Sequence, residues 1–375
     1  MVSLPRILVT FGTRPEAIKM APVVHRLLDS NRLETRICVT AQHREMLDQV
    51  LSVFGIRPNY DLDLMQPGQS LHQLTGRVLN GMKPVLEEFD PHLVLVHGDT
   101  TTTFAVALAS FYQRVPVGHV EAGLRTHNRY SPFPEEMNRH LAAVLADLHF
   151  APTEKARENL LREGIDKESV FVTGNTAIDS LLWMSDRIDQ GIVADRAEIE
   201  NRIGGRRLVL ITAHRRESFG DGFDRICGAL QDLTKRFSDH IFVYPVHPNP
   251  NVIEPVERHL NGIPNLHLIE PLSYAPFVSL MKRAHLILTD SGGIQEEGPS
   301  LGIPVLVMRD TTERPEAVDA GTVILVGNDR NRIVEEASRL LENDQEHAAM
   351  SRKLNPYGDG HAADRILSAI LDGWT

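Results

Sequence analysis

Short apolar runs rich in β-branched residues recur along the chain, and nearly every run is followed by a turn and a segment long enough for a helix. We expect strands at 6–11, 35–41, 92–97, 115–120, 148–152, 170–173, 207–213, 240–246, 266–270, 285–289, 303–308 and 322–326. Helical patterns lie between them, such as those at 22–29, 45–54, 71–88, 134–147, 155–162 and 223–237. Continuous apolar strands that alternate with amphipathic helices are typical of parallel sheets covered on both faces. The sequence therefore predicts an α/β protein.

The length of 375 residues suits two domains rather than one. The stretch 181–206 is polar and has no strong strand pattern, so we place the boundary there. We predict an N-terminal Rossmann-like, doubly wound domain over 1–180 and a second over 206–360, facing each other across a cleft. A helix within 361–375 is expected to pack back on the first domain. The phrase Arg-Pro-Glu-Ala occurs at 14–17 and again at 314–317, which supports two halves of similar build.

Composition excludes several classes of protein. The net charge is −11 and there is no basic block, so nucleic acid is not an expected partner. No apolar run approaches the roughly 18 residues that a membrane span needs, and the chain enters a strand almost at once, so we expect a cytoplasmic protein without a membrane partner. Cys38 and Cys227 are interpreted as small core residues. The histidines lack metal-ligand spacing and no dinucleotide fingerprint follows the first strand, so neither metal nor cofactor is predicted.

Cations follow two of the predicted strands. Gly12 permits a tight turn after the first strand, Pro15 suits the first turn of a helix, and Arg14 and Lys19 place two positive charges beside that helix start. A strand that feeds such a helix is a natural place to hold an anion.

The second cationic group follows the strand at 207–213. His214, Arg215 and Arg216 come directly after it, and adjacent cations repel each other unless an anion joins them. The alternative is a surface ion pair between Arg216 and Glu217.

Glycines mark a third candidate for phosphate binding. Ser291, Gly292 and Gly293 open a predicted helix, and glycines let backbone N–H groups approach a pyrophosphate closely. The alternative is an ordinary helix cap made by the serine. Glu297 lies about one turn into the helix and could bind ribose hydroxyls, although a solvated carboxylate is the simpler interpretation.

Carboxylates gather at the ends of consecutive strands. Asp99 and Glu121 follow the strands at 92–97 and 115–120, and Glu135 opens the next helix with Arg139 four residues on. Carboxylates at one sheet edge provide the acids and bases that proton transfer needs. The plainer alternative is that Asp99 caps the Thr100–Thr103 helix start and that Glu135 pairs with Arg139.

Taken in order along the chain, these segments resemble the non-hydrolysing UDP-N-acetylglucosamine 2-epimerases. The resemblance is carried by segments 11–19, 40–44, 97–102, 119–125, 134–139, 214–217, 290–297 and 313–316 and runs essentially from end to end. It implies the two-domain GT-B fold of many nucleotide-sugar glycosyltransferases, no NAD, no required metal and commonly a homodimer. It also implies UDP-GlcNAc and UDP-ManNAc as substrates, with UDP-GlcNAc as an allosteric activator in many bacterial members.

The resemblance assigns roles to individual residues. Catalysis is expected from Asp99, Glu121, Glu135 and His214. Substrate binding is expected from Arg14, Lys19, Arg139, Phe277, Ser291, Gly292, Gly293, Glu297 and Arg314, with Phe277 at the uracil pocket. The candidates for an allosteric site are Gln42, His43 and Arg215, of which the first two could instead cap the next helix. Leu272 stands where close relatives can carry a polar Gln near the base.

The expected reaction is elimination of UDP to 2-acetamidoglucal followed by re-addition on the other face, supplying UDP-ManNAc for surface polysaccharides. Three rivals use the same pocket: a hydrolysing epimerase, a glycosyltransferase of the same fold, and a UDP-sugar sensor without catalysis. The transferase needs an acceptor-binding surface, for which the sequence gives no signal. The sequence does not decide which carboxylate removes the C2 proton.

Overall fold

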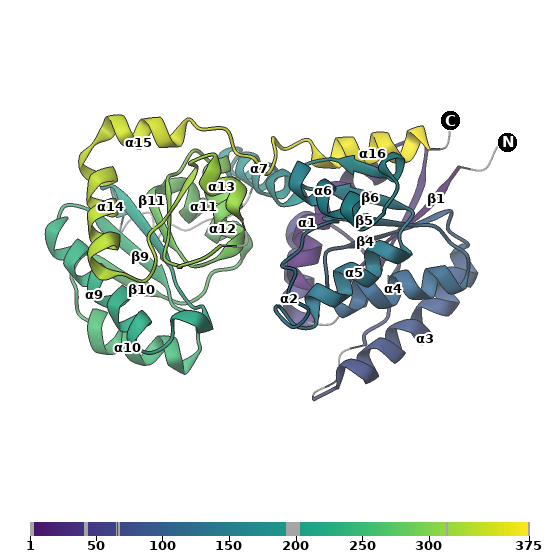
Figure 1. The fold of residues 1–375 in the computed structure, drawn as a ribbon, viewed down its shortest axis with the longest axis horizontal. Coiled ribbons are helices and arrows are strands. Elements are labelled where there is room, and N and C mark those ends of the chain that lie inside the picture. Colours follow the sequence, from purple (N-terminus) through teal and green to yellow (C-terminus); the bar gives the residue numbers. More distant parts are fainter. Residues whose placement is uncertain are drawn as a thin grey trace. The chain divides into compact units, whose positions relative to one another are not determined.

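The computed structural model describes residues 4–40, 44–64, 66, 68–192, 203–312 and 314–373. The chain divides into two compact units, one made of Met1–Ser180 with Tyr357–Thr375 and the other of Leu181–Pro356. Each unit has its own parallel sheet, with helices on both sides of it (Figure 1). The prediction of an α/β protein with doubly wound parallel sheets is confirmed.

The first unit contains a 7-stranded sheet in the order β3-β2-β1-β4-β5-β6-β7, and all neighbouring strands run parallel. Its strands are β1 (Arg6–Phe11), β2 (Glu34–Val39), β3 (Tyr60–Asp61), β4 (Leu93–His97), β5 (Val117–Val120), β6 (Leu148–Ala151) and β7 (Val170–Val172). Because the strand order reverses at β1 and β4, the loops after these strands diverge and leave room for a ligand.

The helices of the first unit begin where the sequence supplies caps. Thr13, Ser70, Thr100 and Thr153 each accept a backbone N–H from the first turn of the helix that follows. The helices are α1 (Arg14–Leu28), α2 (Arg44–Phe54), α3 (Leu71–Phe89), α4 (Thr101–Tyr112), α5 (Glu135–Leu145), α6 (Glu154–Arg162), the 3₁₀ turn Lys167–Ser169, α7 (Thr176–Asp189) and α16 (Ala362–Asp372). The border between the units falls within α7.

The second unit contains a 6-stranded parallel sheet in the order β10-β9-β8-β11-β12-β13. Its strands are β8 (Leu208–Thr212), β9 (Ile241–Pro245), β10 (Leu266–Ile269), β11 (Ala284–Thr289), β12 (Val305–Val307) and β13 (Val323–Leu325). Its helices are α9 (Asp221–Arg236), α10 (Pro250–Leu260), α11 (Tyr274–Arg283), α12 (Gly292–Ser300), α13 (Pro315–Asp319), α14 (Arg330–Glu342) and α15 (Asp344–Ser351), with a 3₁₀ turn at Arg216–Ser218.

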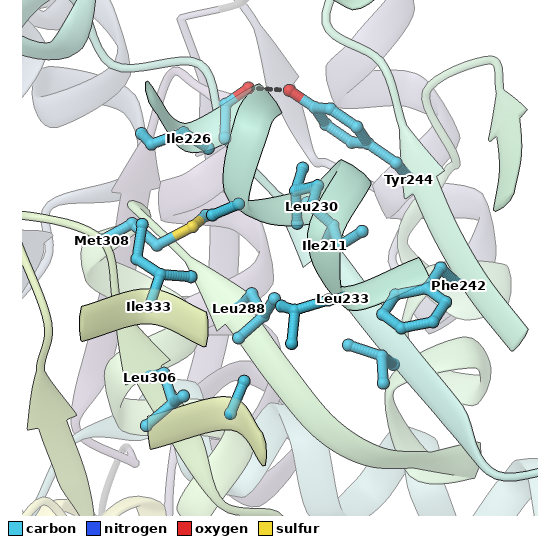
Figure 2. Close-up of a cluster of buried hydrophobic side chains, with 14 of the residues drawn as sticks. Ile211, Ile226, Leu230, Leu233, Phe242, Tyr244, Leu288, Leu306, Met308 and Ile333 are labelled. Carbon is cyan, nitrogen blue, oxygen red and sulfur yellow. Dashed lines mark hydrogen bonds between the residues drawn. The ribbon is translucent and has the colours of Figure 1, made fainter. Parts of the chain in front are cut away.

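A large apolar cluster fixes the second sheet to α9 and α14. Leu230 and Leu233 of α9 pack with Phe242, Leu288 and Ile333, all fully buried (Figure 2). Burying a side chain of this size contributes about 1.5–3 kcal/mol. The Tyr244 hydroxyl lies in the same cluster and donates to the carbonyl of Ala213, 2.5 Å away, which satisfies its polar end. The cluster therefore holds the carboxyl end of β8 in place, directly before His214.

The C-terminal segment belongs to the first unit. The Asp179 carboxylate accepts the N–H of Ala363 at 2.8 Å, and Arg26 of α1 forms an ion pair with Asp364 of α16. Ile366 and Ile370 are buried on the inner face of α16. The last helix is thus held to the first unit by both polar and apolar contacts.

The elements differ from the expected ones in three places. The helical pattern at 22–29 covers only the second half of the first helix, which begins at Arg14, where Gly12 and Pro15 had indicated a helix start and Thr13 provides the cap. The strand β3 has only two residues, too few to give a periodic pattern. The helix α7 occupies part of the polar stretch that we expected to separate the domains. Among the described residues, no helix is long and apolar enough to cross a membrane.

Candidate active site

The turn between β1 and α1 is shaped around the buried carboxylate of Glu16. This carboxylate accepts the backbone N–H groups of Gly12 and Thr13, at 3.1 and 2.8 Å, while the Thr13 hydroxyl accepts the N–H of Glu16. The reciprocal pair is a capping box. A Cβ at position 12 would overlap the hydroxyl of Thr40, so glycine is required there. The turn places Arg14 and Lys19 on the first turns of α1, both half-buried.

Glu16 also ties this turn to the start of α4. Its carboxylate accepts the hydroxyls of Thr100 and Thr103, at 2.8 and 3.3 Å. Burial raises the pKa of Glu16, and the hydrogen bonds from Thr100, from Thr13 and from the backbone of Gly12 oppose the rise. Thr100 and Thr103 therefore serve the helix start and Glu16, and Asp99 does not cap the helix, since Thr100 does.

Glu121 lies at the centre of a charged cluster at the end of β5. Its Oε1 accepts Lys19 Nζ at 2.5 Å and Asn175 Nδ2 at 3.3 Å, and its Oε2 lies 3.2 Å from His97 Nε2. The Glu121 side chain is only 8% exposed. Its backbone has φ of +62°, a left-handed conformation that non-glycine residues seldom adopt. Such a conformation at a buried carboxylate is typical of functional sites.

The loop after β4 carries Asp99 to the start of α5. The Arg139 guanidinium forms a short ion pair with the Asp99 carboxylate, and the Asn138 side chain donates to the Asp99 carbonyl at 2.9 Å. Arg139 also contacts Glu136 at 3.3 Å. The expected alternative pairing of Arg139 with Glu135 is therefore wrong. Within the part of the chain that the structure describes, the buried Oε2 of Glu135 has no hydrogen-bond partner.

His119 of β5 contacts the same loop after β4. Its Nε2 lies 2.7 Å from the carbonyl of Gly98, so it is the protonated nitrogen, and its buried Nδ1 has no partner among the described residues. Burial lowers the pKa of His119 to about 3, because a proton on Nδ1 would place an unpaired charge in the interior.

This depressed pKa makes a contribution to stability that depends on pH. Below pH 6.5 the unfolded chain takes up a proton at His119 that the folded chain refuses, so the free energy of unfolding decreases as the pH falls and levels off near pH 3. At pH 5 the loss is about 2 kcal/mol. The free energy of unfolding, measured with urea, should fall less between pH 7.5 and pH 5 in His119→Gln than in the unchanged protein. An equal fall in the two proteins would show that His119 does not cause this pH dependence. Carboxylates such as Glu16 also change stability with pH, but they do so equally in both proteins and drop out of the comparison.

In the second unit, Asp290 shapes the loop after β8. Its fully buried carboxylate accepts the backbone N–H groups of His214 and Arg215, at 2.6 and 2.7 Å. The His214 ring stacks on His247 with 5.3 Å between centroids. Burial lowers the pKa of His214, which favours the neutral imidazole. The buried Arg215 Nε has no partner among the described residues.

The start of α12 resembles the predicted phosphate cradle. Ser291 stands at the N-cap but makes no side-chain capping bond, so the ordinary-cap alternative is not seen. Gly293 is exposed and has open space where a Cβ would lie. The backbone N–H groups of this first turn are the unpaired donors that anions bind.

Ion pairs in the second unit differ from one expected alternative. Glu217 pairs with Arg309 at 2.5 Å rather than with Arg216, which is exposed. Arg314 forms an ion pair with the buried Glu296 at 2.6 Å, beside the start of α13. Phe277 and Glu297 are half-buried on α11 and α12.

If the His214 loop binds UDP, as the resemblance implies, replacing Asp290 with Ala should weaken that binding by about tenfold to a hundredfold, because the loss of an acceptor for two backbone N–H groups lets the loop move. Isothermal titration with UDP measures this. Asp232→Ala, which removes an exposed partner of Arg330, is the control and should leave the affinity unchanged. An unaltered affinity in the Asp290 variant would show that this loop does not contribute to UDP binding.

Comparison with known proteins shows to which family the chain belongs. A family model described as UDP-N-acetylglucosamine 2-epimerase matches residues 25–371. The chain belongs to this family. It is 60% identical over 371 residues to the UDP-N-acetylglucosamine 2-epimerase of Escherichia coli K12, covering 97% of this chain and 98% of that protein. It is 59% identical over 369 residues to the same-named protein of Yersinia pestis, covering 97% of this chain and 98% of that one. The prediction that the chain is an enzyme of the isomerase class is confirmed.

Solved structures of epimerase family members have the same fold. The UDP-GlcNAc 2-epimerase of Neisseria meningitidis bound to UDP-GlcNAc gives a TM-score of 0.86 at 51% identity, covering 98% of this chain and 100% of that one. The enzyme of Methanocaldococcus jannaschii in complex with UDP-GlcNAc and UDP gives 0.78 at 31% identity, with the same coverage. The prediction of a GT-B-like fold with two parallel sheets is confirmed.

Among the described residues, the structure places the predicted epimerase residues in both units and brings some of them into contact. Lys19 contacts Glu121, and Asp99 contacts Arg139, in the first unit. His214, Arg215 and the start of α12 lie at the carboxyl ends of β8 and β11 in the second. Gln42 and His43 lie outside the described residues.

Sequence reasoning assigned no role to the residues that support the site, namely Glu16, His97, Asn175, Asp290 and Glu296. For Glu16 a signal was present, since Thr13 and Glu16 have the spacing of a capping box. The others carry no signal in the local sequence, because their partners are distant in the chain.

Proposed function

We propose that the chain interconverts UDP-GlcNAc and UDP-ManNAc by eliminating UDP and adding it back. The observation that carries this proposal is the buried Glu121 carboxylate, held by Lys19 at the end of β5 beside the loop of Asp99. A carboxylate next to a cation can exchange a proton while the cation supports an anionic leaving group. The family assignment and the UDP-GlcNAc-bound relative support the choice of substrate.

The reaction needs an elimination because C2 of the sugar carries no acidic proton. Breaking the bond between C1 and the phosphate oxygen lets UDP leave with the bonding electrons and makes C1 cationic. The C2–H bond then breaks, its electrons form the C1–C2 double bond of 2-acetamidoglucal, and the proton passes to a base. Reprotonation of C2 on the opposite face and return of UDP to C1 complete the epimerisation, so no oxidant or reductant is consumed.

We assign the sugar chemistry to the carboxylates of the first unit. Glu121 and Asp99 are the proposed acid and base at C2, since removal and return of the proton on opposite faces requires more than one group. Arg139, bound to Asp99, orients that carboxylate and is the proposed contact to substrate. Glu135, whose buried Oε2 lacks a partner among the described residues, is proposed to assist or to position the sugar.

We assign the nucleotide to cations and helix starts. Arg14 and Lys19 on α1, with His214, Ser291, Gly292 and Gly293, are the proposed contacts to the diphosphate. The remaining proposed contacts are Glu297 for the ribose, Arg314 for UDP and Phe277 for uracil. These groups would stabilise the charge that develops on the departing UDP.

Regulation and assembly are further parts of the proposal. Arg215, whose buried Nε has no partner among the described residues, is the proposed allosteric contact for UDP-GlcNAc, together with Gln42 and His43. A homodimer is also proposed, and exposed apolar side chains on α4 and α5, including Tyr112 and Val144, support an interface. Light scattering of the purified protein measures the assembly, and a monomeric mass would contradict it.

Proton NMR with UDP-GlcNAc in D₂O, without added NAD or metal, tests the reaction. UDP-ManNAc with deuterium at C2 is the expected product. Free ManNAc with UDP would assign a hydrolysing epimerase instead. Saturable binding without any product would leave a glycosyltransferase or a sensor. From the family assignment we also propose that the product, UDP-ManNAc, is supplied to surface polysaccharide synthesis.

A further inference from the structure

His97 is a buried ionisable residue that the proposed roles do not use. It is the last residue of β4, and its side chain is 3% exposed. Its Nε2 lies 3.2 Å from Glu121 Oε2, within hydrogen-bonding distance but not aligned as a hydrogen bond. Its Nδ1 has no partner among the described residues. A buried imidazole without a hydrogen bond is costly, which calls for a functional explanation.

The two oxygens of Glu121 have different surroundings. Oε1 accepts Lys19 of α1 and Asn175, which directly precedes α7. Oε2 faces His97, and the backbone of Gly98 passes close to it, since a Cβ there would lie 3.6 Å away. The histidine is thus placed to act on one particular oxygen of the carboxylate.

The charges around His97 keep its imidazole neutral. Burial lowers its pKa to about 4; the carboxylates of Glu121 and Asp99 oppose this, and Lys19 adds to it. His119, on the neighbouring strand, is neutral as well. A neutral imidazole offers one N–H donor without adding a charge. Such a donor favours an ionised carboxylate over a protonated one.

We infer that His97 is a positioning residue that donates Nε2–H to Oε2 of Glu121, fixing the rotation of the carboxylate and favouring its proton-accepting form. The inference rests on the proposed function, in which Glu121 exchanges a proton with C2. Hydrogen bonds of catalytic groups are often poorly aligned in a protein without its substrate and tighten in the complex.

His97→Phe, which keeps the ring but removes the donor, tests the inference. The expected kcat is lower by about tenfold to a hundredfold, the value of a hydrogen bond to a charged group. KM should be unchanged, because UDP binding does not use this bond. Without the donor the Glu121 carboxyl holds its proton more tightly, so the acid limb of the kcat–pH profile should move up by about one pH unit. His97→Gln places an amide N–H near the same point and should restore most of kcat and the original limb.

His149→Phe is the matched control. His149 is also a buried histidine of this sheet, but its Nε2 lies 2.9 Å from the carbonyl of Ala143, away from Glu121. Its pH profile should be unchanged, even if stability falls. A shifted limb in this control, or an unshifted limb in His97→Phe, would overturn the inference. If the unchanged protein exchanged no deuterium into C2, the proposed function itself would be overturned.

Discussion

Glu121→Gln should lower kcat for UDP-GlcNAc epimerisation by about 10²–10⁴-fold, the range expected when a general acid or base is removed. The amide keeps the size of the side chain and an oxygen that can accept Lys19, so the fold and the position of the cation are preserved. It cannot accept a proton from C2. UDP affinity, measured by isothermal titration, should therefore be unchanged while turnover and C2 deuterium exchange are lost together.

Glu163→Gln provides a matched control in the same unit. Glu163 is another carboxylate in an ion pair, with Arg125 at 2.7 Å, but it has no proposed contact with substrate. The control should retain its turnover. Equal losses of turnover and of UDP affinity in Glu121→Gln would assign this carboxylate to binding rather than to proton transfer.

Glu16→Ala should lower the free energy of unfolding by about 3 kcal/mol, because it leaves the N–H groups of Gly12 and Thr13 buried without an acceptor and opens a cavity. The hydroxyls of Thr100 and Thr103 lose their acceptor as well. Urea unfolding followed by circular dichroism measures the change.

Glu16→Gln is the companion variant. Its amide oxygen can accept the backbone N–H groups, and its NH₂ can donate to a threonine hydroxyl oxygen, so the loss should be no more than about 1 kcal/mol. A Glu16→Ala variant as stable as the unchanged protein would show that the carboxylate does not hold the turn.

The sequence predicted the fold well because its signals are local. Apolar runs such as 208–212 are β-branched and continuous, and they became strands of both sheets. The carboxyl ends of those strands then placed Asp99, Glu121 and His214 by topology alone. The two-residue strand β3 is too short for any period to show.

The supporting contacts could not be predicted in the same way. Asn175 and Glu121 are 54 positions apart, and Asp290 and His214 are 76 apart, so only the folded chain reveals them. The wrong pairing of Arg139 has a similar cause. Its i+4 spacing to Glu135 satisfied a local rule, but the distant Asp99 and the neighbouring Glu136 compete for the guanidinium and take it.

The first unit is discontinuous in sequence, and this has a consequence for its synthesis. Its last helix, α16, is translated only after the whole of Leu181–Pro356. At ordinary elongation rates this takes on the order of 10–30 s. During that interval the backbone N–H of Ala363 that donates to Asp179 and the carboxylate of Asp364 that pairs with Arg26 do not yet exist. Until α16 is made, the surface of α1 that it will cover is exposed to solvent in the nascent chain. The unit that carries Glu121 therefore begins to fold first and finishes last. In the meantime, chaperones and proteases can reach α1.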